Sequence, residues 1–169
     1  GGVSGVRVEK RNDNVAYVVR KVRIGSIICK DNIVSSSTSD AVYMWTETGS
    51  VVFDDIEIES IDSSGSLQAG LHFQVGGRVR VGSLKCRGAG SNALVVDDNM
   101  KHLEIDTLDL GASVGAEIRT LAGATQSGTI KLGHITLQDR GASATVPLNF
   151  ALDTVKRIEI GTIVDLTAT

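Results

Sequence analysis

The fold follows from one stretch, Val79-Arg80-Val81-Gly82-Ser83-Leu84-Lys85-Cys86, which has the pattern apolar-x-apolar-(Gly or Asp)-x-apolar-x-apolar. The chain contains six copies of this pattern, and they begin at Val22, Val51, Val79, Leu103, Ile130 and Ile158. Consecutive copies start 24 to 29 residues apart. A repeat with a period in this range is typical of a solenoid. The pattern therefore predicts that the chain winds as a series of stacked coils.

A second element lies between successive copies and consists of a small residue followed by a short apolar-x-apolar stretch. It occurs at 15–18, 41–44, 70–73, 93–96, 115–118 and 147–150. Such alternation directs one set of side chains inward and the other outward, as in a strand. This element is the first strand of each coil, and the two halves of the eight-residue pattern are the second and third. The sequence predicts an all-β, single-stranded parallel β-helix of about six coils with three strands per coil, right-handed by the crossover preference of parallel strands.

A two-residue corner is predicted between the second and third strands. Its first residue is Gly25, Asp54, Gly82, Asp106, Gly133 or Gly161. Gly adopts left-handed backbone conformations freely and Asp tolerates them, so we expect such a conformation at each corner.

Outward positions on the second strand support stacking of the coils. The series reads Arg23, Val52, Arg80, Glu104, Lys131, Glu159, and its sign alternates from the third coil onward. Opposite charges are favoured on neighbouring strands. A leucine-rich repeat is the alternative, because Ile24, Ile27, Cys29, Asn32 and Val34 fit its pattern. The later copies place Ile61, Ala89, Ser113 and Arg140 at the Asn position and offer no helix-forming stretch, so the β-helix is favoured.

Composition indicates one domain over residues 1–169 with a core of aliphatic residues, since 41% of residues are hydrophobic and only 4% aromatic. The net charge of −3, with scattered Lys and Arg, argues against nucleic-acid binding. No apolar run approaches the roughly 20 residues of a membrane span, so membrane insertion is not expected. The chain begins Gly1-Gly2 and its last coil has no cap, from which we expect a segment of a longer chain.

Both cysteines, Cys29 and Cys86, occupy the last apolar position of their copies, with Ile58 between them. Two coil spacings of about 4.8 Å place them beyond disulfide reach. We expect two buried free thiols.

The three-strand coil of 24 to 29 residues with a two-residue corner resembles the right-handed parallel β-helix of the pectate-lyase-like superfamily, to which phage tailspikes and many polysaccharide lyases and hydrolases belong. The resemblance covers about residues 6–166. It implies that the outer face of the first strand, with the loops that follow it, forms a carbohydrate groove. The acidic calcium-ligand cluster of the lyases is missing, and of the polygalacturonase motifs only the dipeptide Asp97-Asp98 is present. No metal site and no cofactor are expected.

On that face we expect two outward rows that hold most of the aromatic and polar candidates. Substrate-binding candidates are Tyr17, Tyr43, Trp45, Gln74, Arg119 and Asn149. Aromatic rings stack on sugars and amides bond their hydroxyl groups. The alternative is structural, because Tyr is favoured on exposed strand faces and stabilises its neighbours across strands.

Catalytic candidates are Asp97, Glu117 and His72. Asp97 and Glu117 are expected to be diagonal neighbours, with backbones about 8 Å apart. A separation of about 6.5 to 9.5 Å between carboxyl groups suits an inverting glycosidase. His72 could assist proton transfer.

These features predict a carbohydrate-engaging domain of a tailspike-like or polysaccharide-degrading protein, either hydrolase or lyase, that binds an extended polysaccharide. By the same resemblance we expect a homotrimer at the cell exterior or on a virion surface. The alternative is a non-catalytic β-helical spacer or adhesin module, and a third possibility is a site whose acids come from a neighbouring subunit.

Overall fold

The described part of the chain is built from β-strands without a helix. The computed structural model describes residues 5–10, 18–30, 40–46, 52–65, 68–74, 76–96, 101–120, 128–139, 147–150 and 156–166. Within these ranges, no helix is available that could cross a membrane.

The strands fall into a short-strand sheet and a long-strand sheet. The short-strand sheet contains β1 (Val6–Lys10), β4 (Val42–Thr46), β6 (Ala69–Gln74), β8 (Asn92–Val96), β10 (Ile118–Thr120) and β12 (Leu148–Asn149). The long-strand sheet contains β2 (Val18–Val19), β3 (Val22–Lys30), β5 (Val52–Ser64), β7 (Gly76–Arg87), β9 (His102–Gly111), β11 (Thr129–Gln138) and β13 (Arg157–Asp165).

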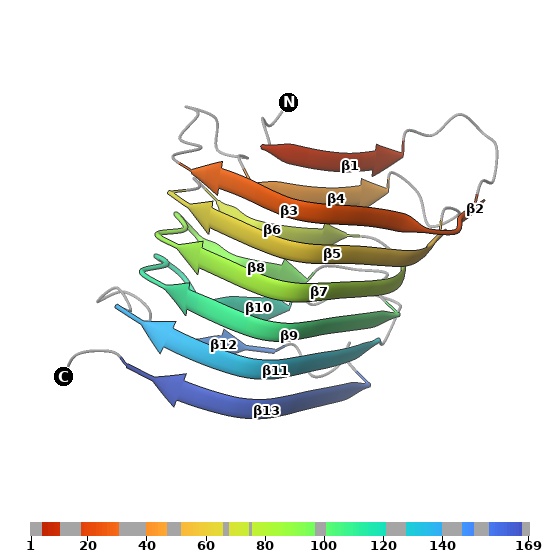
Figure 1. Cartoon of the computed structure of the whole chain (residues 1–169). Helices are drawn as coiled ribbons and strands as arrows, with labels where there is room; N and C mark the ends of the chain where they lie inside the picture. The colour runs from red at the N-terminus through yellow and green to blue at the C-terminus, as the bar shows by residue number, and fades with distance from the viewer. Residues whose placement is uncertain are drawn as a thin grey trace.

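All pairings between neighbouring strands are parallel, and the chain alternates between the two sheets as it advances. Figure 1 shows the long strands stacked in front of the short ones, with the two sets pointing in opposite directions. The ends of the chain lie at opposite ends of the stack. This arrangement is a parallel β-solenoid and confirms the predicted fold at that level.

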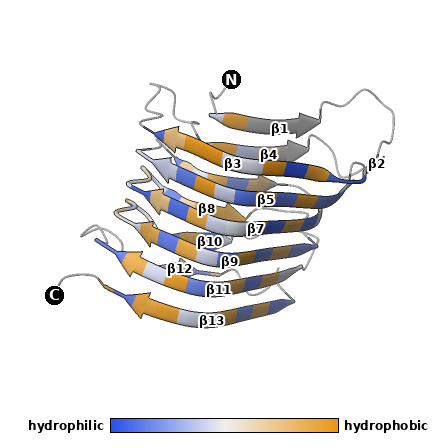
Figure 2. Cartoon of the chain, viewed as in Figure 1, coloured by the Kyte–Doolittle hydropathy of each residue, from blue (hydrophilic) through white to orange (hydrophobic). Residues whose placement is uncertain are grey.

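The core lies between the two sheets and is aliphatic. Figure 2 shows that apolar and polar residues alternate along the long strands. The apolar residues of this alternation fill the core. Ile56, Val79 and Leu103 are fully buried on successive long strands, and Leu71 and Phe73 face them from β6. Burial of each such side chain stabilises the fold by about 1.5–3 kcal/mol.

Neither the predicted coil count nor the predicted division into three strands is confirmed. The structure has about three turns, whereas about six were predicted. Each long strand also runs continuously through the corner. The bend between the expected second and third strands is therefore too gentle to end the strand.

The register of the second repeat differs from the prediction. Val22 pairs with Ile56 and Ile24 pairs with Ile58, so the second copy of the pattern begins at Ile56 and not at Val51. The apolar run at 51–53 imitates the start of the pattern, which led to the error. The corner residue of this copy is therefore Glu59 and not Asp54.

With this register the outward charges form an uninterrupted ladder of alternating sign. The charge ladder consists of Arg23, Glu57, Arg80, Glu104, Lys131 and Glu159, each in register with the next. Arg23 Nε lies 2.8 Å from Glu57 Oε2, and Lys131 Nζ lies 2.6 Å from Glu104 Oε1. The ladder specifies the pairing order more completely than the sequence pattern suggested.

Three of the four corner glycines, Gly82, Gly133 and Gly161, are required for space, and none is required for a left-handed backbone. Among the described residues, the glycines with positive φ are Gly65, Gly77 and Gly88, none of which is a corner. A Cβ atom on Gly133 would lie 2.2 Å from the carbonyl oxygen of Asp106 on the preceding strand. The expectation of left-handed corners is wrong, because no corner residue in the described ranges has positive φ. At Gly82, Gly133 and Gly161 the backbone of the neighbouring strand leaves no room for a side chain.

Left-handed residues occur where the long strands end. Gly65, Gly88, Ala112 and Asp139 all have positive φ and directly follow β5, β7, β9 and β11. The Gly65 and Gly88 amides donate to the carbonyls of Arg87 and Gly111, which links consecutive turns. The sharp turn of the solenoid is thus made here.

The two cysteines are buried free thiols, as predicted. The residue between them in register is Ser63 and not Ile58. Burial raises the pKa of Cys86 to about 12.

Candidate functional site

One outward row crosses the short-strand sheet and carries several of the predicted site residues. Successive strands place Tyr43, His72, Val95, Arg119 and Asn149 in register. The sequence predicts Glu117 in this row and Arg119 in the adjacent one. In the structure β10 is displaced by two residues relative to this prediction, so that Ile118 and Thr120 point into the core. The sequence did not indicate this register, because Thr120 is a polar residue in a core position.

Glu117 does not lie on the outer face. Its side chain is fully buried, and its two carboxylate oxygens accept hydrogen bonds from the amide and the hydroxyl of Ser113, at 3.2 and 2.6 Å. Ser113 is itself fully buried. The carboxylate therefore holds the loop before β10 to the strand, and a substrate on the outer face cannot reach it.

The structure describes only some of the other predicted site residues. Asp97 and Tyr17 lie outside the described residues, so the proposed Asp97–Glu117 pair is not present among them. Trp45 and Gln74 are described as strand backbone, in register with each other on β4 and β6.

His72 is held from two sides. Its Nδ1 atom lies 3.1 Å from Asp40 Oδ2, and its ring lies 4.9 Å from that of Tyr43, centroid to centroid, at 44°. The other Asp40 oxygen accepts a hydrogen bond of 3.0 Å from the amide of Ala69. A carboxylate so placed favours the tautomer that carries its proton on Nδ1 and fixes the orientation of the ring.

This pair forms one wall of a small pocket of about 220 Å³ on the outer face. We call it the short-strand pocket; it is lined by Asp40, Gln68, Ala69, His72, Ser91, Asn92, Val95 and Arg119. Small-molecule pockets commonly measure about 300–1,000 Å³, so this one suits a single ring or side group of a longer ligand.

The polar wall of the pocket is ordered by hydrogen bonds that reach across turns. Asn92 Nδ2 donates to the carbonyl of Ala116, and Asn92 Oδ1 accepts from the Ser91 hydroxyl. Arg119 is exposed, and the described residues contain no ion pair to it. The pocket therefore combines a fixed imidazole with a guanidinium group available to an anion.

Sequence reasoning identified His72 and Arg119 but missed Asp40, Gln68, Ser91 and Asn92. Asp40 and Asn92 both stand immediately before the small residue that opens a short strand. That repeated Asp or Asn was visible in the sequence and could have indicated a side chain that bonds the next turn.

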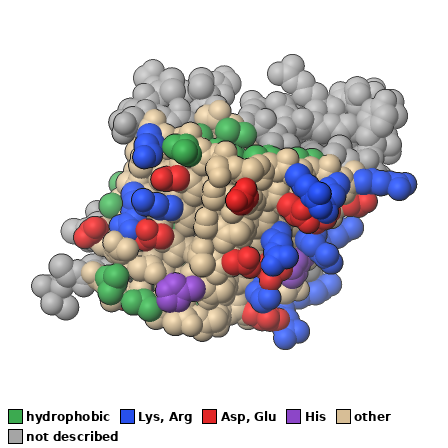
Figure 3. All heavy atoms as spheres, in the orientation of Figure 1, with side chains coloured by type: hydrophobic (Ala, Val, Ile, Leu, Met, Phe, Trp, Pro, Cys, Tyr) green, Lys and Arg blue, Asp and Glu red, His purple; other side chains and the backbone are tan. Residues whose placement is uncertain are grey.

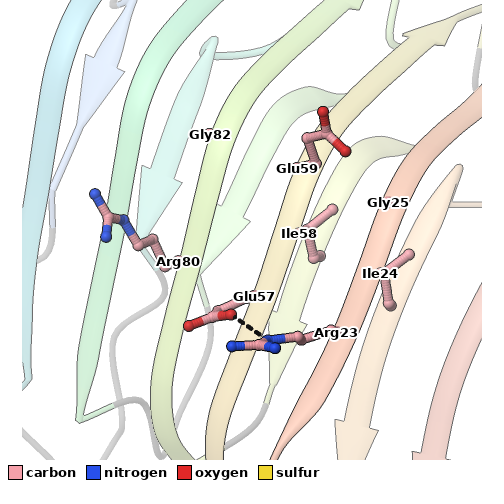
Figure 4. A pocket seen from close by; sticks show the side chains of 8 residues that line it. All are labelled: Arg23, Ile24, Gly25, Glu57, Ile58, Glu59, Arg80 and Gly82. Atoms are coloured by element: carbon pink, nitrogen blue, oxygen red, sulfur yellow. Dashed lines mark hydrogen bonds and ion pairs between the residues drawn. The ribbon is translucent and has the colours of Figure 1, made fainter.

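A second, larger depression crosses the long-strand sheet at the corner. This corner groove of about 500 Å³ is lined by Arg23, Ile24, Gly25, Glu57, Ile58, Glu59, Arg80 and Gly82. Figure 4 shows Arg23 directed at Glu57, while Glu59 and Arg80 point away from that pair. Arg80 Nη2 instead lies 3.6 Å from Asp106. Both arginines of the groove are thus already paired with acids, which makes the groove the weaker candidate.

The described residues contain no group of three or more His, Cys, Asp or Glu side chains that could hold a metal ion.

In comparisons with known proteins, the chain matches no protein-family model, no curated protein and no solved structure.

Proposed function

We propose that this β-solenoid binds a glycan on the outer face of the short-strand sheet, with the short-strand pocket as a subsite for an acidic sugar. The observation that carries the proposal is the placement of exposed Arg119 in one pocket with His72, whose ring is oriented by Asp40. A guanidinium group binds a sugar carboxylate with two parallel hydrogen bonds. Tyr43, next to His72 in the row, offers an aromatic face.

The row that contains the pocket extends beyond it along the solenoid. Asn149 is exposed and lies in register with Arg119 on the following strand. A linear glycan parallel to the solenoid axis would therefore meet Tyr43, His72, Arg119 and Asn149 in turn. The broader assignments, a right-handed helix of the pectate-lyase-like or tailspike type, a homotrimer and an extracellular or virion-surface location, belong to the same proposal.

The test is binding of short oligosaccharides, because a di- or trisaccharide fills one subsite. We would titrate neutral and uronic-acid oligosaccharides calorimetrically into the parent, Arg119→Gln and Lys85→Gln. Lys85 is an exposed cation on the long-strand sheet, so its variant matches the charge change. We expect the parent to prefer the acidic sugar, Arg119→Gln to weaken that binding about tenfold, and Lys85→Gln to bind as the parent does. Equal binding by the parent and Arg119→Gln would refute the proposal.

The second candidate function is a rigid spacer or adhesin module, and the charge ladder favours it. An unbroken series of alternating charges stiffens the stack without contributing a ligand site. If no glycan binds, and Arg23→Gln with Arg80→Gln lowers the force that unfolds single molecules, the spacer is the better description.

A further inference from the structure

Positive charge gathers along the edge where the long strands begin, away from the short-strand pocket. Backbone hydrogen bonds place Gly77, Lys101, Gly128 and Lys156 in one row. The adjacent row holds Arg78, His102, Thr129 and Arg157 in register. We call these eight residues the cationic edge. Figure 3 shows many Lys and Arg side chains on that side of the molecule, with Asp and Glu side chains among them.

Three of these cations have no ion-pair partner within the described ranges. The described residues include no ion pair to Arg78, Lys101 or Lys156, all of which are exposed. By contrast, Arg157 Nε lies 2.6 Å from Glu159, and His102 Nε2 lies 4.0 Å from Glu104. The acids of the charge ladder are thus engaged, Glu159 and Glu104 partly by residues of the edge itself, whereas the described residues contain no acid paired with Arg78, Lys101 or Lys156.

A shallow pocket of about 240 Å³ lies at the same place. It is lined by Asp54, Gly77, Arg78, Lys101 and His102. Gly77 and Gly128 stand in the same row as the two lysines and have no side chains to cover them. Lys101 and Lys156 stand two strand spacings apart, about 9.6 Å, with Gly128 between them, so an anion could approach the backbone there.

We propose that the cationic edge binds a linear anionic polysaccharide, at a site separate from the short-strand pocket. Arg78 lies on β7, and Lys101 and Lys156 directly precede β9 and β13. Because these strands are stacked along one axis, the three charges follow a line, which suits an extended polymer with sulfate or carboxylate groups along it. Asp54 opposes the anion at one end of this line and limits the affinity. The inference stands independently of the function proposed for the pocket.

The composition of the edge favours a polysaccharide over other polyanions. Its eight residues include no Phe, Tyr or Trp on which unstacked bases could lie, although proteins that bind single-stranded nucleic acids rely on such stacking. They include no large apolar side chain that could enter a lipid surface. Only charge and hydrogen bonding are available here.

The experiment compares two double variants with the same change in net charge. Arg78→Gln with Lys101→Gln removes two of the edge cations, and Lys30→Gln with Lys85→Gln removes two exposed cations at the other half of the long strands. Each folded protein would be titrated with a sulfated linear polysaccharide, a uronic-acid polysaccharide, neutral dextran, a single-stranded oligonucleotide and anionic phospholipid vesicles. Thermal unfolding of each variant verifies that the fold is intact.

We expect the parent to bind one or both anionic polysaccharides in a salt-dependent manner and to leave dextran unbound. The edge variant should bind about three- to tenfold more weakly, given the modest strength of each exposed pair. Asp54→Asn should bind more tightly than the parent, and the control double variant should bind as the parent does. The two anionic polymers distinguish sulfate from carboxylate recognition.

Arg119→Gln separates this site from the short-strand pocket. Long-polymer binding that is retained in Arg119→Gln and weakened in the edge variant supports the edge, whatever the pocket binds. Equal loss in the edge and control variants would overturn the inference, as would tighter binding of the oligonucleotide or the vesicles than of either polysaccharide.

Discussion

Arg23 lies in register with Glu57 on the next long strand, and its Nε atom is 2.8 Å from the Glu57 Oε2 atom. This contact is the first step of a ladder in which every outward charge faces its opposite on the neighbouring strand. Each exposed pair contributes little free energy by itself, but the series opposes any shift of one strand past another.

The charge ladder should stabilise the folded state at intermediate pH, and this contribution should be lost at both acidic and alkaline pH. Hydrogen bonds from Lys21 and Arg23 lower the pKa of Glu57 below its usual 4.5, and Lys131 does the same to Glu104. Carboxyl groups with lowered pKa stabilise the folded state above their unfolded pKa, and that contribution is lost as the pH falls through the folded pKa. Conversely, Glu104 raises the pKa of Lys131 above 10.5, so this contribution is lost as the pH rises beyond that value.

Urea unfolding measured from pH 2 to 11 examines this behaviour. We expect Glu57→Gln with Glu104→Gln to be less stable than the parent at pH 7 and to lose less stability on acidification. Parallel curves for the two proteins would show that the ladder does not contribute.

Removal of the buried carboxylate of Glu117 should destabilise the fold. Glu117→Ala leaves the amide and the hydroxyl of Ser113 without acceptors in a buried site, which costs about 1–3 kcal/mol in the free energy of unfolding. Glu117→Gln keeps one acceptor oxygen and should lose less. Denaturant unfolding at pH 7 measures both. A Glu117→Ala variant with parental stability would contradict the structural role.

Two corner glycines should respond differently to the same substitution. In Gly133→Ala the new Cβ would lie 2.2 Å from the Asp106 carbonyl oxygen, whereas in Gly25→Ala its nearest neighbour would be 3.9 Å away. We expect Gly133→Ala to lower the free energy of unfolding by about 1–3 kcal/mol. Gly25→Ala should change it by less than about 0.5 kcal/mol.

Chemical denaturation of the two variants decides the point. Equal losses would mean that the corner needs Gly for its backbone conformation, as the sequence suggested, and not for the space between strands.

Several errors in the sequence-based prediction share one cause. The period-2 alternation identifies a strand but does not say which alternate residues of two strands are paired, because the loops between repeats vary in length. Val51 was therefore taken for the start of a copy that begins at Ile56, and Glu117 for a member of the row that Arg119 occupies. In both cases the residues that the predicted register would bury are also apolar.

The candidate site was predictable only in part for the same reason. His72 and Arg119 stand out in the sequence as polar residues within apolar strands. Asp40 does not, because it lies at the end of a loop, 32 residues before the imidazole that it orients. Only the winding of the chain brings the two together.

The sequence by itself determined that the chain is a parallel β-solenoid with an aliphatic core, because a repeated apolar alternation can be buried only by stacking copies upon one another. Tertiary structure alone decided the register, and with it the continuous charge ladder, the burial of Glu117 and the assembly of the short-strand pocket. These depend on which side chains fill the core across neighbouring turns, and that choice is settled by packing between segments far apart in the chain.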